Sequence, residues 1–224
     1  MDTLFNPWKK FEISDSMIHE ADVEAVRQHN SRVGSDYQFL DHLAPEPWIG
    51  DTSARVLVLL ANPGATLQDV QRKPQNLASL INQLSIANLR GELKDYPHFF
   101  FDPRLIGSDG YNWYASRFAH LIKETSAQNV SQKILSCELV PYHSFSWKKP
   151  RLLPPTQQYT FNLVVEAMKR DAVILIGRGR AEWFKNVPGL EKYSRYFQPS
   201  SPQSAYVSPN NYGKNFEEIL RAIQ

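Results

Sequence analysis

Four polar segments of the sequence follow apolar stretches and carry the side chains best suited to chemistry. They are Asn62-Pro63-Gly64, Glu138 to Ser144, Gly177-Arg178-Gly179-Arg180 and Ser208-Pro209-Asn210-Asn211. An amide can orient water, a carboxyl group or an imidazole can move a proton, and arginine beside glycine can bind phosphate. Because the carboxyl ends of parallel strands meet at one edge of a sheet, we expect these segments to form one ligand-binding site.

The first segment places Asn62 at the end of an apolar run, residues 55–61. Pro63 fixes its own φ angle, and Gly64 permits a close backbone approach. The turn is therefore predicted to hold the Asn62 side chain in one direction, although Asn-Pro-Gly is also common in turns that only connect elements.

Glu138 and His143 are the candidate groups of the second segment. An ionised carboxylate only accepts hydrogen bonds, so Glu138 is expected to favour ligand groups that present donors. The alternative is a carboxylate that is exposed or ion-paired at a strand end. His143 is predicted to donate a hydrogen bond or to act as a general acid, the alternative being a loop histidine bonded to the backbone.

Basic residues gather in two of the predicted loops. Arg178 and Arg180 adjoin glycines before a helix, where backbone N–H groups can approach a phosphate. In the other loop, cationic and stacking groups alternate as they do in nucleic-acid contacts: Phe145, Trp147, Lys148, Lys149 and Arg151. The alternative for both loops is a solvated basic surface.

The elements that must position these segments alternate along the chain. Apolar and β-branched runs at residues 55–61, 134–140, 172–176 and 205–207 predict strands, and apolar residues at helical spacing lie between them. Alternating strands and helices favour parallel pairing with right-handed crossovers. The predicted fold is therefore α/β, a three-layer α/β/α sandwich around a mainly parallel four-stranded sheet.

The composition fits one domain over residues 1–224, with residues 1–51 as a helical and proline-rich extension packed on it. A net charge of +2 neither requires nor excludes a nucleic-acid partner. The single cysteine, Cys137, favours a reducing compartment, and no stretch is long and apolar enough to span a bilayer. A cytoplasmic location without membrane contact is expected. No metal-ligand spacing is visible, and neither a metal nor another cofactor is predicted.

The order and spacing of the four polar segments resemble those of the uracil-DNA glycosylase superfamily, over residues 45–224. The resemblance implies that Asn62 orients the hydrolytic water. The base would contact Pro63, Gly64, Glu138, Tyr142 and Tyr206. The nucleic-acid backbone would contact Ser208, Pro209, Asn210, Asn211, Arg178, Arg180, Lys148 and Lys149.

The chain departs from the family pattern at three positions. The second family motif usually begins with a histidine that stabilises charge on the departing base, where this chain has Tyr206, or Gln198 in an alternative register. Loss of such a donor typically costs about 3 to 4 kcal/mol of transition-state stabilisation. Glu138 stands where the family often has a base-reading asparagine. The resemblance therefore implies that an ionised Glu138 favours base edges that present donors and disfavours uracil. No aromatic residue follows Asn62 closely, which leaves five candidates for the stacking residue: Phe99, Phe100, Phe101, Tyr111 and Trp113.

Three functions are open on these grounds. The first is a glycosylase-like DNA repair protein that binds a flipped nucleobase in DNA and hydrolyses its N-glycosidic bond, outside classical uracil removal. The second is a non-catalytic protein of the same fold that binds nucleic acid or a modified nucleotide. The third is a small-molecule hydrolase that uses Glu138 as its base. The expected partner is DNA, single- or double-stranded, or a nucleobase-containing small molecule.

Overall fold

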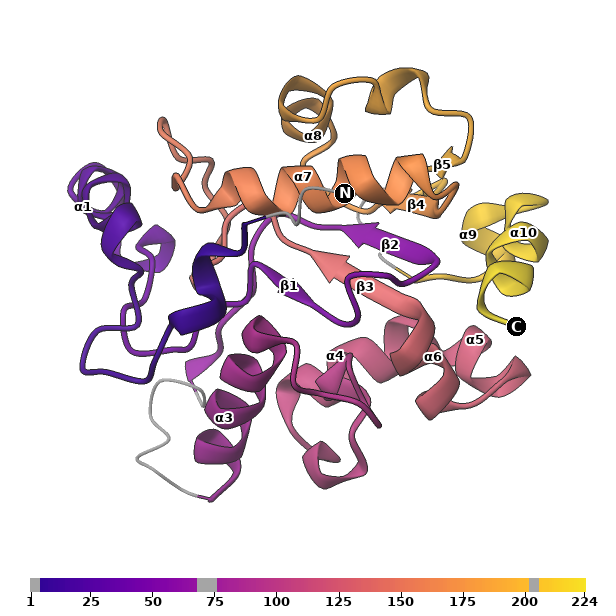
Figure 1. Ribbon diagram of the computed structural model, residues 1–224, viewed down its shortest axis with the longest axis horizontal. Helices are drawn as coiled ribbons and strands as arrows, with labels where there is room; N and C mark the ends of the chain where they lie inside the picture. The colour runs from indigo at the N-terminus through magenta and orange to yellow at the C-terminus, as the bar shows by residue number, and fades with distance from the viewer. Residues whose placement is uncertain (1–4, 68–75, 202–205) are drawn as a thin grey trace.

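The computed structural model describes residues 5–67, 76–201 and 206–224, and a five-stranded sheet lies at its centre (Figure 1). The strands are β1 Trp48–Ile49, β2 Val56–Leu59, β3 Ile134–Cys137, β4 Val173–Ile176 and β5 Tyr196–Phe197, in the spatial order β1-β3-β2-β4-β5. β2 runs parallel to both β3 and β4, β5 runs parallel to β4, and β1 is antiparallel to β3. The carboxyl ends of the central strands therefore meet at one edge.

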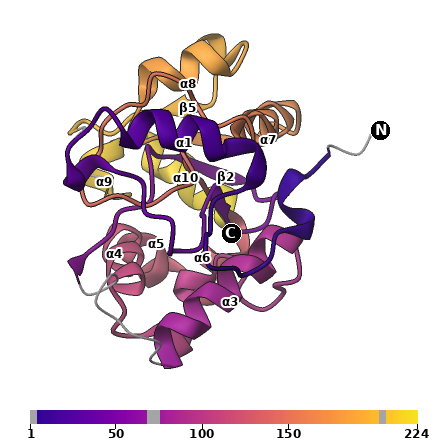
Figure 2. The same ribbon diagram turned by 90° about the vertical axis from the view of Figure 1, so that its left-hand side faces the viewer.

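Helices cover both faces of this sheet (Figures 1 and 2). One face is covered by α7 Gln157–Lys169 and α8 Arg180–Asn186. The other is covered by α3 Asn76–Arg90, α4 Asp109–Arg117, α5 Ala119–Glu124, α6 Ala127–Lys133 and α10 Asn215–Ile223. α1 Val23–Asn30 and α9 Pro209–Tyr212 lie toward opposite ends of the molecule in Figure 1. This arrangement is the predicted three-layer α/β/α sandwich.

The remaining helical turns are short 3-10 segments. They are η1 Pro7–Lys10, η2 Glu20–Asp22, η3 Ser35–Tyr37, η4 Phe99–Phe101, η5 Pro103–Leu105 and η6 Leu190–Lys192. Among the helices of the described residues, none combines the length and the hydrophobicity needed to cross a membrane.

The strands are apolar along their whole length because both faces of the sheet are covered. In β2, Leu57 and Leu59 pack on the side of α7 and α8, while Val56 and Val58 pack against the helices of the opposite face. All four side chains are buried. Successive side chains of a strand point to opposite faces, so β2 contributes to both halves of the core.

The structure corrects the predicted strands at both edges of the sheet. Five strands are present in the described residues, where the sequence predicts four. β1 lies in the proline-rich extension, for which no strand is predicted. β5 is not predicted either, and the strand predicted at residues 205–207 is wrong where it can be checked: Tyr206 and Val207 belong to no strand, and residue 205 lies outside the described residues. Strands of two residues carry too little periodicity to be recognised in a sequence.

Buried contacts attach the N-terminal extension to the sheet and its helices. Trp8 is fully buried, and the Tyr142 hydroxyl donates a hydrogen bond of 2.7 Å to Asp22 Oδ2. Asp22 also accepts hydrogen bonds from the backbone and the side chain of Thr156, just before α7. Within the extension, helix α1 begins at Val23 and ends at Asn30.

Gly50 follows β1 and allows this strand to lie against β3. Its φ angle is +122°, and a Cβ at this position would overlap the carbonyl oxygen of Ile134. Both the backbone conformation and the close approach require glycine. The Gly50 N–H also donates to Asn88 Oδ1 at 3.0 Å, and the Asn88 amide donates to the Trp48 carbonyl at 2.7 Å. These contacts fix β1 and the segment that leads into it.

We expect Gly50→Ala to lower the free energy of unfolding by about 1–3 kcal/mol, because strained backbone conformations cost this much. Gly34→Ala is the matched control, since Gly34 has a φ angle of −71° and open space around its Cα. The control should be neutral or should stabilise the protein by up to about 1 kcal/mol. Urea denaturation measures both variants, and equal unfolding free energies would contradict the role given to Gly50.

Candidate functional site

Backbone hydrogen bonds join the loops that follow β2 and β3. The Ser144 N–H donates to the Pro63 carbonyl at 3.3 Å, and the Ala65 N–H donates to the Ser144 carbonyl at 3.1 Å. Gly64 and Ser144 form an isolated parallel bridge. The pairing of the two strands thus continues past their ends, and it places side chains of both loops at one edge of the sheet.

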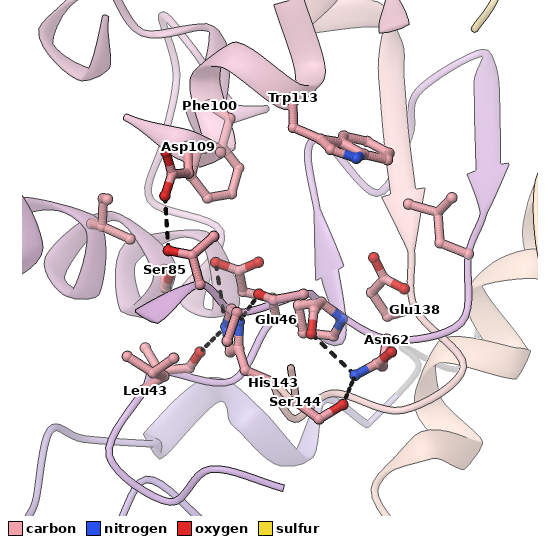
Figure 3. Close-up of a pocket in the computed structure, with 18 of the residues that line it drawn as sticks. Leu43, Glu46, Asn62, Ser85, Phe100, Asp109, Trp113, Glu138, His143 and Ser144 are labelled. Atoms are coloured by element: carbon pink, nitrogen blue, oxygen red, sulfur yellow. Dashed lines mark hydrogen bonds and ion pairs between the residues drawn. The ribbon is translucent and has the colours of Figure 1, made fainter. Parts of the chain in front are cut away.

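Three acceptors hold the Asn62 side chain in one orientation. Its amide nitrogen donates to Ser144 Oγ at 2.8 Å, to the Pro63 carbonyl at 3.1 Å and to the Tyr142 carbonyl at 3.3 Å. Two of these partners are carbonyl oxygens, which cannot donate, so Nδ2 rather than Oδ1 must face them. Oδ1 is thereby directed away from the loop and toward Glu138 (Figure 3).

Asn62 borders a cavity of about 310 Å³ between the strand edge, α3 and the first turns of α4. This volume is at the lower end of the range for small-molecule sites. The walls combine aromatic rings with polar and charged groups, among them Phe100, Trp113, Tyr114, Phe145, Trp147, Glu46, Asn62, Ser85, Asp109, Glu138, His143 and Arg178. Such a lining suits a flat ligand with hydrogen-bonding groups on its edge.

Two buried carboxyl groups line this cavity, Glu46 before β1 and Glu138 after β3, and they are only 6% and 4% exposed. Burial raises the pKa of Glu138 well above its ordinary value, and the negative charge of Glu46 raises it further, while the Arg178 guanidinium lowers it. No described residue forms a hydrogen bond with Glu138 Oε2. The structure therefore favours a neutral Glu138, with one donor and one acceptor, in place of the ionised acceptor that the sequence predicts.

An uncharged polar network lies beside Glu138 on the same face of β3. Ser136 is two residues earlier on this strand, so it points in the same direction. His98 Nε2 lies 3.0 Å from Ser136 Oγ, and the Tyr114 hydroxyl faces the same serine. Burial lowers the pKa of His98 to about 3 and raises that of Tyr114. Both side chains are therefore neutral near pH 7 and offer Glu138 no compensating charge.

His143 is tied to the backbone through both nitrogens of its ring. Nδ1 lies 2.8 Å from the Gly64 carbonyl oxygen, and Nε2 lies 3.1 Å from that of Ala44 and 3.8 Å from Glu46 Oε1. Carbonyl oxygens only accept, so both contacts are hydrogen bonds at once only when the imidazole carries two protons. This geometry is the backbone-bonded alternative, in which His143 joins the loop after β3 to the segment before β1.

Tyr142 points away from the cavity, contrary to the prediction that it contacts the base. Its hydroxyl is occupied by Asp22 and by the His19 N–H, which donates to it at 3.1 Å. Its ring packs in the core cluster that contains Trp8, at 6.5 Å between ring centroids. Tyr142 is therefore part of the core, whereas the next residue, His143, lines the cavity.

The second loop of the family resemblance lies near the cavity without lining it. Tyr206 is 42% exposed, and its ring centroid lies 4.7 Å from the Arg117 guanidinium. The same guanidinium lies 4.9 Å from the ring of Trp113, which does line the cavity. The other predicted residues of this loop cap or form α9: Ser208, Pro209, Asn210 and Asn211. The structure therefore connects this loop to the site through Arg117 and Trp113.

The predicted phosphate-binding residues lie in two loops that an ion pair joins. Arg178 lines the cavity, and Arg180 begins α8 and is exposed. Lys149 forms an ion pair with Glu182 of α8. Lys148, its neighbour in the loop before α7, is exposed.

Two of the five candidate stacking residues line the cavity, Phe100 and Trp113. The other three pack in the hydrophobic cluster on the α3–α6 face of the sheet, where Phe99 and Phe101 are buried. Which of the aromatic residues reach the cavity depends on the directions in which the side chains of η4 and α4 point. The local sequence does not show these directions.

Sequence reasoning misses several residues that line the cavity, among them Glu46, Ser85, Asp109 and Tyr114. The only sequence feature that could have pointed to Glu46 is its position between two prolines, the second of which is followed by an apolar pair. Ser85 Oγ is buried and has no hydrogen-bond partner among the described residues. Like Glu138 Oε2, it is an unsatisfied polar atom on a residue of the cavity wall, which is unusual for a native interior.

The acidic residues of the cavity do not form a metal site. Glu46, Asp109 and Glu138 all line it. Within the described ranges, however, no group of three or more histidine, cysteine, aspartate or glutamate side chains is placed to hold a metal ion. Cys137 is buried in the core, and burial raises the pKa of its thiol.

Comparison of the chain with known protein families finds no matching family model, and comparisons with curated proteins and with solved structures find no match either. The functional interpretation therefore depends on the sequence motifs and on the geometry of the cavity.

The raised pKa of Glu138 predicts that stability falls as pH rises. Between the ordinary pKa of about 4.5 and its higher value in the folded state, the folded protein holds the extra proton. The free energy of unfolding then decreases with pH by up to about 1.4 kcal/mol per unit. Glu138→Gln removes this dependence, so the variant should gain stability relative to wild type from about pH 5 to pH 8.

Urea denaturation across this pH range measures the effect. Glu166→Gln is the control, because Glu166 faces solvent beside Lys169, 2.7 Å away. Its pH dependence should follow that of wild type. Parallel curves for wild type and Glu138→Gln would contradict the raised pKa.

Proposed function

We propose that the cavity binds a nucleobase of DNA and that the protein hydrolyses the N-glycosidic bond of that base, as a divergent uracil-DNA-glycosylase-like protein. The observation that carries the proposal is the fixed orientation of Asn62, whose Nδ2 is held by three acceptors while Oδ1 is directed toward Glu138. A water that donates a hydrogen bond to this Oδ1 is positioned with a lone pair free for attack on a sugar carbon.

The reaction leaves negative charge on the departing base. Water attacks the anomeric carbon and loses one proton, the C–N bond breaks with its electron pair going to the base, and the base takes up a proton, so that the net proton transfer is from water to base. A neutral Glu138 can supply a hydrogen bond or that proton, and the Arg178 guanidinium at the cavity wall supplies positive charge. Donors oriented in advance are effective where charge develops in a site that excludes water. These two groups would replace the histidine of the second family motif.

The protonation state of Glu138 also affects which base is bound. A neutral carboxylic acid presents one donor and one acceptor, as an asparagine amide does, and so complements a base edge on which the two alternate. Uracil presents such an edge. The predicted discrimination against uracil applies only to the ionised form. Phe100 and Trp113 are placed to contact the faces of a flat base.

A second candidate is a non-catalytic protein that binds the same ligand. It is favoured by the positions of His143 and Tyr206, because the imidazole is bonded to backbone carbonyls and the tyrosine does not line the cavity. Neither side chain would then stabilise a departing base. A small-molecule hydrolase with Glu138 as general base is less favoured, because a neutral acid does not accept a proton from water.

Base release from oligonucleotides that carry each normal and damaged base tests the two candidates. If Asn62 positions the water, Asn62→Ala should abolish release and leave oligonucleotide affinity nearly unchanged, because it removes an interaction made in the transition state. Asn112→Ala, at an exposed position of α4, is the control and should keep full activity. Equal release by Asn62→Ala and wild type would exclude the hydrolytic role. Binding without release by wild type would select the non-catalytic candidate.

Base preference should depend on pH through Glu138. As this group ionises, uracil meets an acceptor where it needs a donor, whereas guanine can give two donors to the carboxylate. Competition between free uracil and free guanine, measured as pH is raised through the folded-state pKa of Glu138, should therefore shift toward guanine in wild type and remain constant in Glu138→Gln. The same shift in both proteins would show that Glu138 does not touch the base.

A further inference from the structure

A second, smaller cavity lies between α1 and the loop that precedes α7, and its volume is about 160 Å³. Its polar lining consists of Arg32, Lys148, Lys149 and Arg151, with Gln28 and His29. No acidic residue lines it in the described part of the chain. His29 adds no charge near pH 7, because burial and the nearby Lys148 lower its pKa. In Figure 1, α1 and the loop before α7 lie at the same end of the molecule.

Two arginines of this basic cavity have no partner among the residues that the structure describes. Within the described ranges, the side chains of Arg32 and Arg151 form no hydrogen bond or ion pair. By contrast Arg27, on the same helix, forms an ion pair of 2.8 Å with Glu24. Positive charges that gather without acidic partners repel one another and attract anions.

The basic cavity adjoins the main cavity along the chain. Trp147 lines the main cavity, and Lys148, the next residue, lines the basic one. Lys149 continues the lining and forms an ion pair with Glu182 of α8. That helix follows Arg178, which lines the main cavity. An extended polyanion could therefore contact both cavities.

We propose that the basic cavity binds a backbone phosphate of the nucleic-acid strand whose base occupies the main cavity. Its volume is below the range of sites for whole small molecules and suits a single phosphate group. Arginine guanidinium groups match phosphate oxygens with paired donors, and lysines add charge. The inference rests on the proposed nucleic-acid substrate, and it gives the N-terminal extension a part in binding.

The test is the affinity for a fluorescein-labelled single-stranded oligodeoxynucleotide at a series of salt concentrations. The double variant Arg32→Gln/Arg151→Gln should flatten the dependence of log affinity on log salt by roughly 0.7 per removed charge. The control Arg27→Gln/Lys169→Gln removes the same charge from two side chains that already have acidic partners. It should keep the wild-type slope. All four positions are exposed, so both variants should fold.

A double variant with the wild-type slope overturns the proposal, and so does a wild type that does not bind the oligonucleotide. Thermal stabilisation by inorganic phosphate that is lost in the double variant, without oligonucleotide binding, assigns the cavity to free phosphate and also overturns it. Binding of free nucleobases tests the main cavity separately and should be unchanged in the double variant. Predicted salt slopes without free-base binding would support the phosphate site and refute the proposed function.

Discussion

The parallel pairing of β2 with β3 does not stop where the strands end, and the candidate site depends on this continuation. The bridge between Gly64 and Ser144 brings an amide of one loop within 2.8 Å of a hydroxyl of the other. Asn62 is consequently held by groups from two segments, and its carbonyl oxygen keeps one direction without a ligand. A side chain that is oriented before binding loses little entropy when it acts on a ligand, which is the basis of preorganised sites.

Two carboxyl groups buried at one cavity, Glu46 and Glu138, destabilise the folded state when both are ionised. A neutral Glu138 avoids most of the cost, because a protonated acid is far cheaper to bury than a carboxylate. The unsatisfied atoms Glu138 Oε2 and Ser85 Oγ belong to two walls of the same cavity. These unsatisfied polar atoms lower the stability of the folded state at the place where the proposed ligand would bind, as is common at functional sites.

The N-terminal extension is part of the site. It contributes Glu46, whose charge raises the pKa of Glu138, and the Ala44 carbonyl that contacts His143. Asp22 fixes the extension through Tyr142, the residue directly before His143. In the short loop after β3, Tyr142 thus holds the extension, and the next residue, His143, lines the cavity.

The sequence alone predicts the three central strands β2, β3 and β4, their alternation with helices and the turn that carries Asn62, because periodicity and turn chemistry are local properties. It does not predict the two-residue edge strands β1 and β5. Only the tertiary structure decided that Glu138 is buried beside Glu46, that Tyr142 faces the core, and that Phe100 and Trp113 reach the cavity. Each of these outcomes depends on contacts between segments far apart in the chain. Burial and nearby charge set a carboxyl group's pKa, and strand register sets a side chain's direction; neither is written in the neighbouring residues.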